Sequence, residues 1–308
     1  MKKICLIASL ITVFALSSAS VNAQYYFFDG DYYENPVLYE AGVSVNAMNS
    51  LTDLGGKKGI GEKFLKDLNL GYTSISGGIF FSVSYKNAVA LRLEGTFGKV
   101  SSDDKILAGI NDAAKNRFNR NLNFRSNISE VAALVEIHPM YIFVDWPAKE
   151  TTPPRTSPYL LAGVGYFSFN PQTKIGNRTI DLQPLSTEGQ GFAEYPNRPI
   201  YKLNQLNIPM GAGVKYELSP LVNLRAEVVY RKLFTDYLDD LSTTYIDPAL
   251  FDKYLTPQKA ANAKILYDRQ IVKVAGINGK RGTEKNNDAY FTANLKISVI
   301  IGRERIRR

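Results

Sequence analysis

Apolar and polar residues alternate with a period of two through much of this chain. From Tyr39 to Ala47 every second residue is apolar, and the residues between them are polar or small. This spacing places the two sets on opposite faces of a β-strand. Similar segments recur along the chain, although one of them, 158–169, is apolar on both faces and leaves its inward face open. The pattern predicts eight strands, at residues 37–48, 72–85, 88–100, 124–138, 158–169, 204–217, 221–233 and 289–302.

Alternating strands also suit a soluble β-sandwich, in which each sheet has one face in water. Three features favour a membrane barrel instead. The strands reach the length of about ten residues that a tilted transmembrane strand needs. Tyrosines such as Tyr39, Tyr85, Tyr216 and Tyr230 end the apolar faces, and long connections alternate with short ones. We therefore predict an all-β fold: an eight-stranded antiparallel transmembrane β-barrel of the outer-membrane type, with long extracellular loops and short periplasmic turns.

The first residues have the features of a signal peptide. Lys2 and Lys3 precede an apolar run from Ile4 to Leu16, and small residues lead to Ala23. The run is too short for a transmembrane helix, so we predict a signal peptide at 1–23 and a barrel domain at 24–308. The only cysteine, Cys5, lies inside the signal. We expect an outer-membrane protein without disulfides, and an even number of strands places both termini in the periplasm.

The charge of the chain is moderately basic. The formal net charge is +8, and loss of Lys2 and Lys3 with the signal leaves +6. The excess is spread along the chain, apart from a basic C-terminal tail at 303–308. A nucleic-acid partner is therefore not expected, whereas the lipid bilayer is.

The polar faces of the strands carry charged residues of both signs. An eight-stranded barrel is only wide enough to be filled by side chains, so we predict a buried salt-bridge network in the lumen. A proton or ion path through the same residues is the open alternative, and a diffusion porin would need more strands. The predicted network consists of Glu40, Arg92, Glu94, Glu130, Glu136, Lys215, Arg225, Glu227, Arg231 and Lys296.

No catalytic set is recognisable, so we expect a protein that is not an enzyme and needs no cofactor or metal. The only histidine, His138, has no serine or aspartate motif beside it, and a structural role is favoured. The segment after the seventh strand contains a candidate loop motif, Asp236, Tyr237, Asp239 and Asp240. Its carboxylates could hold a divalent cation, but turn capping is favoured. The polar segment 182–191 is interpreted as loop architecture, with a partner contact as the alternative.

Several segments resemble a family of Bacteroidota outer-membrane barrels of otherwise unknown function, which includes the PorG-type subunit of the type IX secretion system. The resemblance is carried by Ala90–Leu93 with Phe97–Lys99, Arg120–Glu130, Pro158–Gly165, Leu182–Gly191 and Tyr230–Asp240.

This resemblance implies a non-enzymatic membrane component of the type IX protein secretion or gliding apparatus, in contact with periplasmic secretion-system proteins. The chain departs from such barrels at its end, where a basic tail replaces the usual terminal aromatic residue. The alternative is a surface ligand-binding or adhesion barrel that acts through its long extracellular loops.

Overall fold

The computed structural model describes residues 36–55, 70–109, 114–144, 154–284 and 287–301. The expected signal peptide at 1–23 and the basic tail at 303–308 lie outside these ranges. Among the described residues, no helix combines the length and the apolar character needed to cross a membrane.

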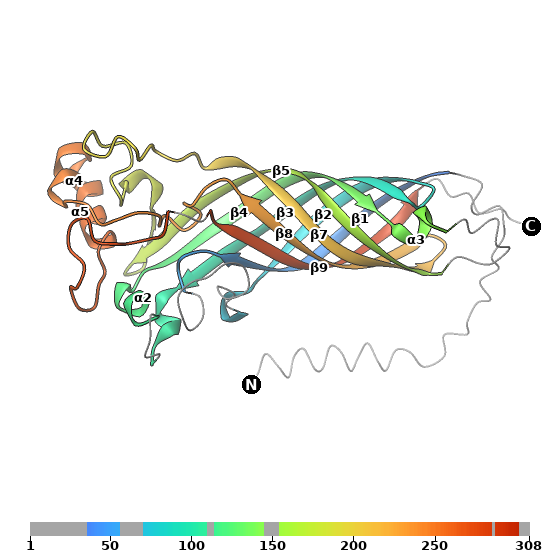
Figure 1. Cartoon of the computed structure of the whole chain (residues 1–308), viewed down its shortest axis with the longest axis horizontal. Coiled ribbons are helices and arrows are strands. Elements are labelled where there is room, and N and C mark those ends of the chain that lie inside the picture. Colours follow the sequence, from blue (N-terminus) through green and yellow to red (C-terminus); the bar gives the residue numbers. More distant parts are fainter. Residues whose placement is uncertain (1–35, 56–69, 110–113, 145–153, 285–286, 302–308) are drawn as a thin grey trace, which may run out of the picture. The chain divides into compact units, whose positions relative to one another are not determined.

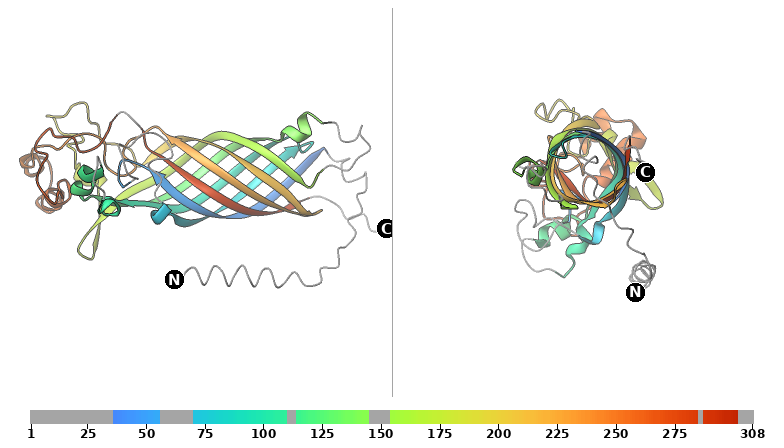
Figure 2. Two further views of the ribbon diagram at one scale, coloured as in Figure 1. Left: turned by 60° about the horizontal axis from the view of Figure 1, so that its bottom comes forward. Right: turned by 90° about the vertical axis from the view of Figure 1, so that its right-hand side faces the viewer.

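Eight antiparallel strands close into a barrel, which confirms the predicted fold class. The ring runs β4-β3-β2-β1-β9-β8-β7-β5 and is closed by the pairing of β5 with β4. Figure 1 shows the strands tilted along the long axis, and the end-on view in Figure 2 shows the closed ring. The strands of the ring are β1 Val37–Leu51, β2 Ser74–Tyr85, β3 Val89–Asp103, β4 Asn123–Ile137, β5 Thr156–Ile175, β7 Asn204–Ser219, β8 Val222–Leu233 and β9 Ala289–Ile301.

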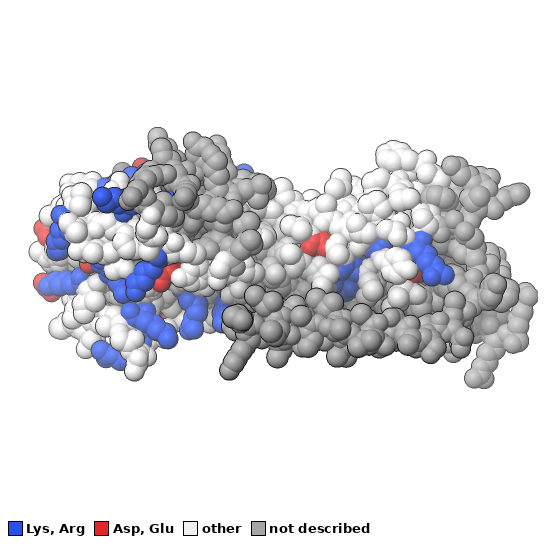
Figure 3. Space-filling model, turned by 90° about the horizontal axis from the view of Figure 1, so that it is seen from below, with Lys and Arg blue, Asp and Glu red and all other residues white. Residues whose placement is uncertain are grey.

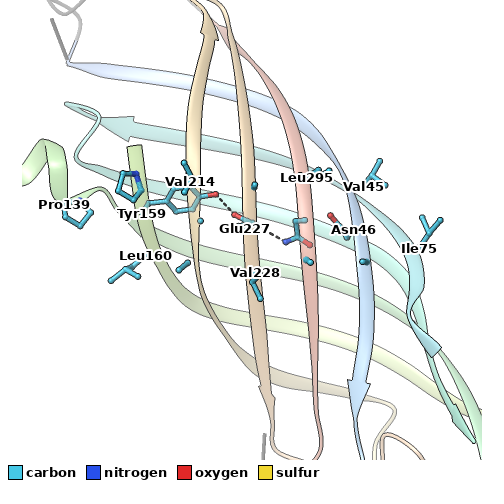
Figure 4. Close-up of a pocket in the computed structure, with 17 residues that line it drawn as sticks. Val45, Asn46, Ile75, Pro139, Tyr159, Leu160, Val214, Glu227, Val228 and Leu295 are labelled. Atoms are coloured by element: carbon cyan, nitrogen blue, oxygen red, sulfur yellow. Dashed lines mark hydrogen bonds between the residues drawn. The ribbon is translucent and has the colours of Figure 1, made fainter. Parts of the chain in front are cut away.

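Side chains along each strand alternate between the lumen and the outer wall. On β4 the alternation runs the whole length of the strand, with every second residue buried. The outward residues are apolar: Leu91 is 64% exposed and Leu295 69%. Figure 4 shows Tyr159 and Glu227 pointing into the barrel while Leu160 and Val228 point away from it. The position of Tyr159 therefore shows which face of β5 points into the lumen, a question that the sequence leaves open.

The strand β5 is longer than the expected segment 158–169. It continues to Ile175 and pairs with a ninth short strand, β6 (Arg178–Asp181), in a region expected to be loop. The extension carries Asn170 and Gln172 on its outer face. Because these side chains are polar, the apolar alternation that marks the rest of β5 stops before the strand does.

The two ends of the barrel differ in their connections. At the turn end, β2 and β3 are joined through Lys86 and Asn87, whose φ angles of 52° and 54° match a type I′ hairpin turn. The strands β7 and β8 are joined at the same end through Pro220 and Leu221. The first and last strands pair there as well, with Tyr39 opposite Ile301. The opposite end, which we call the loop end, carries the long connections (Figure 1).

The loops at the loop end fold into a structure that we call the cap, formed by described residues of 52–55, 104–122, 176–203 and 234–288. Its helices are α2 (Ala114–Arg120), α4 (Ala249–Tyr254) and α5 (Pro257–Leu266). The last two lie in the connection between β8 and β9. A core of buried apolar residues runs from the loop end of the lumen into the cap, and includes Leu54, Phe124, Phe167, Phe192, Leu238, Phe251 and Leu266.

Candidate functional site

The lumen contains all ten charged residues that the sequence places there. Each has an exposed fraction of 7% or less. Five are acids and five are bases, so their formal charges cancel. These residues are Glu40, Arg92, Glu94, Glu130, Glu136, Lys215, Arg225, Glu227, Arg231 and Lys296.

Ion pairs between these side chains cross the lumen. Arg92 Nη1 on β3 lies 3.0 Å from Glu227 Oε2 on β8, and three strands separate β3 from β8 in either direction around the ring. Arg225 Nη1, also on β8, lies 2.7 Å from Glu136 Oε2 on β4. Buried charges need such partners because their desolvation is costly. The network therefore ties opposite walls together through the space that a channel would occupy.

Small side chains in the lumen leave space for the long bases, and an aromatic ring packs against these bases. Ser82 and Thr96 are buried on the lumen faces of β2 and β3. The centre of the Phe80 ring lies 5.4 Å from Arg225 Cζ and 5.0 Å from Lys296 Nζ. These are cation–π distances, so the ring also offsets part of the positive charge.

Uncharged residues also bind to the network and are not among the residues predicted for it. Tyr159 donates to Glu227 Oε2 at 2.6 Å, and Asn294 donates to the other oxygen, Oε1, at 2.9 Å. Figure 4 shows Tyr159 directed at Glu227. Asn207 donates to Glu130 Oε1 at 2.8 Å. Both asparagines lie on polar strand faces and could have been found there, whereas the apolar surroundings of Tyr159 conceal its inward direction.

His138 has one neighbour, Ser157, that the sequence does not predict. Its Nδ1 lies 2.9 Å from Ser157 Oγ, and its Nε2 lies 3.4 Å from Glu136 Oε2. No sequence motif around His138 indicates Ser157, because only the pairing of β4 with β5 brings this residue close. The imidazole and Ser157 are each 1% exposed. Since Glu136 also binds Arg225, these three residues belong to the lumen network.

The segment 182–191 is buried in the cap and pins other loops to it. Glu188 has no exposed surface. It accepts hydrogen bonds from the backbone N–H groups of Ser242 at 3.1 Å and Thr243 at 2.8 Å. Arg281 Nη1 binds the same carboxylate at 2.8 Å. One side chain therefore joins three segments of the cap through charge-assisted bonds.

Asp240 of the candidate loop motif forms a second joint in the cap. Its carboxylate accepts hydrogen bonds from Thr187 Oγ1 and Tyr201 Oη, both at 2.6 Å. Its backbone carbonyl accepts one from Arg281 at 3.1 Å. The residue adopts a left-handed φ of 63°, a conformation that aspartate tolerates better than most residues. The polar segment 182–191 and the candidate loop motif are thus in contact in the cap.

The other motif residues contact different parts of the cap. Asp239 accepts hydrogen bonds from the backbone N–H groups of Leu54 and Leu241, and the Tyr237 ring stacks on Tyr201 at 4.7 Å. The bond from Leu241 is the local turn contact typical of aspartate. In the described part of the chain, no three His, Cys, Asp or Glu side chains are grouped so that they could hold a metal ion.

Several carboxyl groups of the cap have raised pKa values. Burial raises the pKa of Asp236 to about 9, and the neighbouring acid Asp239 adds to this rise. Burial raises the pKa of Asp240 to about 6, although the Arg281 guanidinium opposes the shift. Burial also holds the pKa of Asp288 well above its usual range. The cap therefore contains acids that keep their protons at a pH where exposed aspartates lose them.

No protein-family model and no curated protein matches this chain. Among solved structures, it is similar to Neisserial surface protein A, with 10% identity, a TM-score of 0.36 and coverage of 86% of this chain and 96% of that one. It is similar to Ail, the attachment invasion locus protein of Yersinia pestis, with 9% identity, a TM-score of 0.35 and coverage of 86% and 97%. A third, the outer membrane protein OprG of Pseudomonas aeruginosa, has 12% identity, a TM-score of 0.33 and coverage of 86% and 92%.

Proposed function

We propose that this chain spans the outer membrane as a β-barrel and holds a folded cap at the cell surface. The observation that carries the proposal is the apolar outer wall, on which Val43, Leu91, Leu160 and Leu295 each expose more than half of their surface. A wall of this kind is suited to lipid and poorly suited to water. In this orientation the cap faces outward, and the turn end, where Tyr39 of the first strand pairs with Ile301 of the last, faces the periplasm.

We further propose that the barrel is neither a diffusion channel nor an enzyme. Ion pairs such as Arg92–Glu227 run across the lumen, which argues against free passage of solutes. The one imidazole, His138, is enclosed in the same network, which argues against a role as an accessible general base. The protein would then act through its surfaces, namely the cap, the turns and the chain ends.

The family resemblance narrows this proposal to a PorG-like component of the type IX secretion or gliding apparatus. Two of the segments that carry the resemblance contact each other in the cap, through the bond between Thr187 and Asp240. The turns and the basic tail would contact periplasmic secretion-system proteins. Deletion of the gene should reduce secretion of type IX cargo, and the intact gene should restore it. Unchanged secretion in the deletion strain would refute this role.

The alternative is a surface barrel that binds a ligand through its cap. It is favoured by the ordered cap, which has buried aromatic residues such as Phe192 and Phe251. A variant in which a short linker replaces the residues between Phe234 and Asn287 distinguishes the two functions. Lost surface binding with normal cargo secretion would support the adhesion barrel, whereas lost secretion with an intact barrel would support a secretion role for the cap.

A further inference from the structure

Three exposed bases lie on the outer wall at the loop end. Lys99 of β3, Arg125 of β4 and Lys174 of β5 all occupy outward positions of their strands. We call these three residues the basic row. Figure 3 shows Lys and Arg side chains gathered over the loop end of the molecule.

The strand register makes the members of the row neighbours. Lys99 pairs with Asn127, so Arg125 stands two residues along β4 from its direct partner. Arg125 pairs with Gln172, so Lys174 stands two residues along β5 in the same way. Such diagonal neighbours lie about 7–8 Å apart on one face of a sheet. Three positive charges on adjacent strands therefore repel each other.

Acids near the row do not pair with its members. In the described part of the chain, the ion pairs join other residues, and none includes a member of the row. The acid on the same face of the β5–β6 hairpin is Asp181. It accepts hydrogen bonds from the amides of Asn170 at 3.1 Å and Gln172 at 2.7 Å. These neutral amides leave the charge of Asp181 in place, and Asp103 lies on the outer face of β3 two residues from Ser101, which pairs with Arg125. Three bases beside these two acids leave the row with a net positive charge.

We call the apolar band of outward residues on the barrel wall the apolar belt. The row begins where this belt ends. Phe97 is 57% exposed and lies two residues before Lys99 on the same face of β3. On β4, the outward positions between the apolar Val131 and Arg125 carry Ser129 and Asn127. A molecule bound to the row must therefore lie against the barrel wall, at and above the level of the lipid headgroups.

Three of the four exposed bases on the outer faces of the ring strands at the loop end lie on β3, β4 and β5, and the fourth is Lys232 of β8. The outward residues of β1 within 37–51 and of β9 within 289–301 include no charged side chain. A uniform basic rim would indicate general attraction to an anionic surface. A row on three adjacent strands indicates a site with a defined position and spacing.

We infer that the basic row binds a glycolipid of the outer leaflet that carries two or more phosphate groups. The inference rests on the proposed membrane location. Phosphates supply the opposite charge, and a glycolipid with several of them can contact more than one base at once. Its acyl chains would lie on the apolar belt beside Phe97, while its sugars and phosphates would reach Arg125 and Lys174.

The test compares two variants with equal charge change in the full-length mature protein, refolded in detergent. The row variant is K99Q/R125Q/K174Q, and the control variant K202Q/K259Q/K280Q removes three exposed lysines elsewhere in the cap region. Native mass spectrometry measures binding of diphosphorylated lipid A. Near an anionic lipid each base contributes about 1 kcal/mol, so the row variant should bind about 100-fold more weakly than the wild type. The control variant should bind like the wild type.

Several outcomes would overturn the inference. Equal binding by the row variant and the wild type would do so, and so would equal losses in both variants, because these would indicate general charge attraction. Equal binding of monophosphorylated and diphosphorylated lipid A would exclude a site for two phosphates. Displacement of the glycolipid by inorganic phosphate would indicate a site for the free ion instead.

A separate measurement distinguishes this inference from the proposed function. Insertion into vesicles of phosphatidylcholine alone, followed by flotation, depends on the apolar belt and not on the row. If the wild type and both variants insert while the row variant binds lipid A normally, only the glycolipid site is refuted. If the folded wild type does not insert, the proposed membrane location itself is refuted.

Discussion

The lumen and the cap both bury charged residues, but they balance them differently. In the lumen, five acids meet five bases. Each carboxylate forms an ion pair with at least one base on another strand. In the cap, the buried acids Asp236, Asp239 and Asp288 lie close enough together to raise one another's pKa values. The lumen is thus held by ion pairs between equal numbers of acids and bases, whereas the cap combines ion pairs such as Glu188–Arg281 with buried acids that keep their protons. The two regions should therefore respond differently to mutation and to pH.

The largest effect is expected from breaking the lumen network. Arg225 binds Glu40 and Glu136 at 2.7 Å each, so R225M leaves two buried carboxylates without this partner. Loss of one partner of a buried pair costs about 3–5 kcal/mol. The urea midpoint of the barrel, followed by circular dichroism in lipid vesicles, should fall. R125M, which removes an exposed arginine from β4, is the matched control and should leave the midpoint unchanged.

A smaller effect, limited to the cap, is expected from Glu188. E188Q weakens the bonds to Arg281 and to two backbone amides, and hydrogen bonds to charged groups contribute about 1.5–3 kcal/mol. Trypsin should cleave the cap faster at exposed lysines such as Lys259, while the barrel stays resistant. E194Q removes an exposed acid that pairs with Lys253 and should not change the cleavage rate. Faster digestion of the barrel strands would contradict the independence of the two regions.

The cap should also loosen as the pH rises. An aspartate whose pKa is raised on folding stabilises the folded state fully below its ordinary pKa, and this contribution is lost as the pH rises through the folded value. For Asp240, whose pKa rises from 3.8 to about 6, the loss between pH 5 and pH 8 is about 1 kcal/mol. Asp236, with a pKa of about 9, extends the loss to higher pH.

Hydrogen exchange, corrected for intrinsic rates, measures this loosening. Amides of 234–246 should exchange faster at pH 8 than at pH 5, whereas amides in β4 should keep their protection. D240N should reduce the pH dependence in the cap. A cap that becomes more protected as the pH rises would show that its carboxyls are ionised and paired in the way those of the lumen are.

The smallest effect is expected from H138A. If His138 only completes the lumen network, the variant should leave the phospholipids and glycolipids of the outer membrane unchanged in acyl composition. S157A should behave in the same way. A lipid profile that changes equally in both variants would identify the His138–Ser157 pair, 2.9 Å apart, as functional and would refute the proposal that the barrel is not an enzyme.

The lumen could be predicted from the sequence because the period of two assigns each strand residue to a face. That rule places Arg92 and Glu227 in the same space without any knowledge of their partners. The cap could not be predicted, because its contacts join residues far apart in the chain: Glu188 and Arg281 are separated by 93 residues, and Thr187 and Asp240 by 53. Ser157 could not be predicted beside His138 for a related reason, since only strand pairing brings the two residues together.

Single-channel recording from the folded barrel in a planar lipid bilayer tests the central claim most directly. Insertion would be confirmed first by the heat-dependent mobility of the folded protein on a gel. The ion pairs across the lumen predict no stable conductance steps at neutral pH for the wild type. Steady, reproducible steps from inserted wild-type protein would contradict a lumen closed by its own charged side chains.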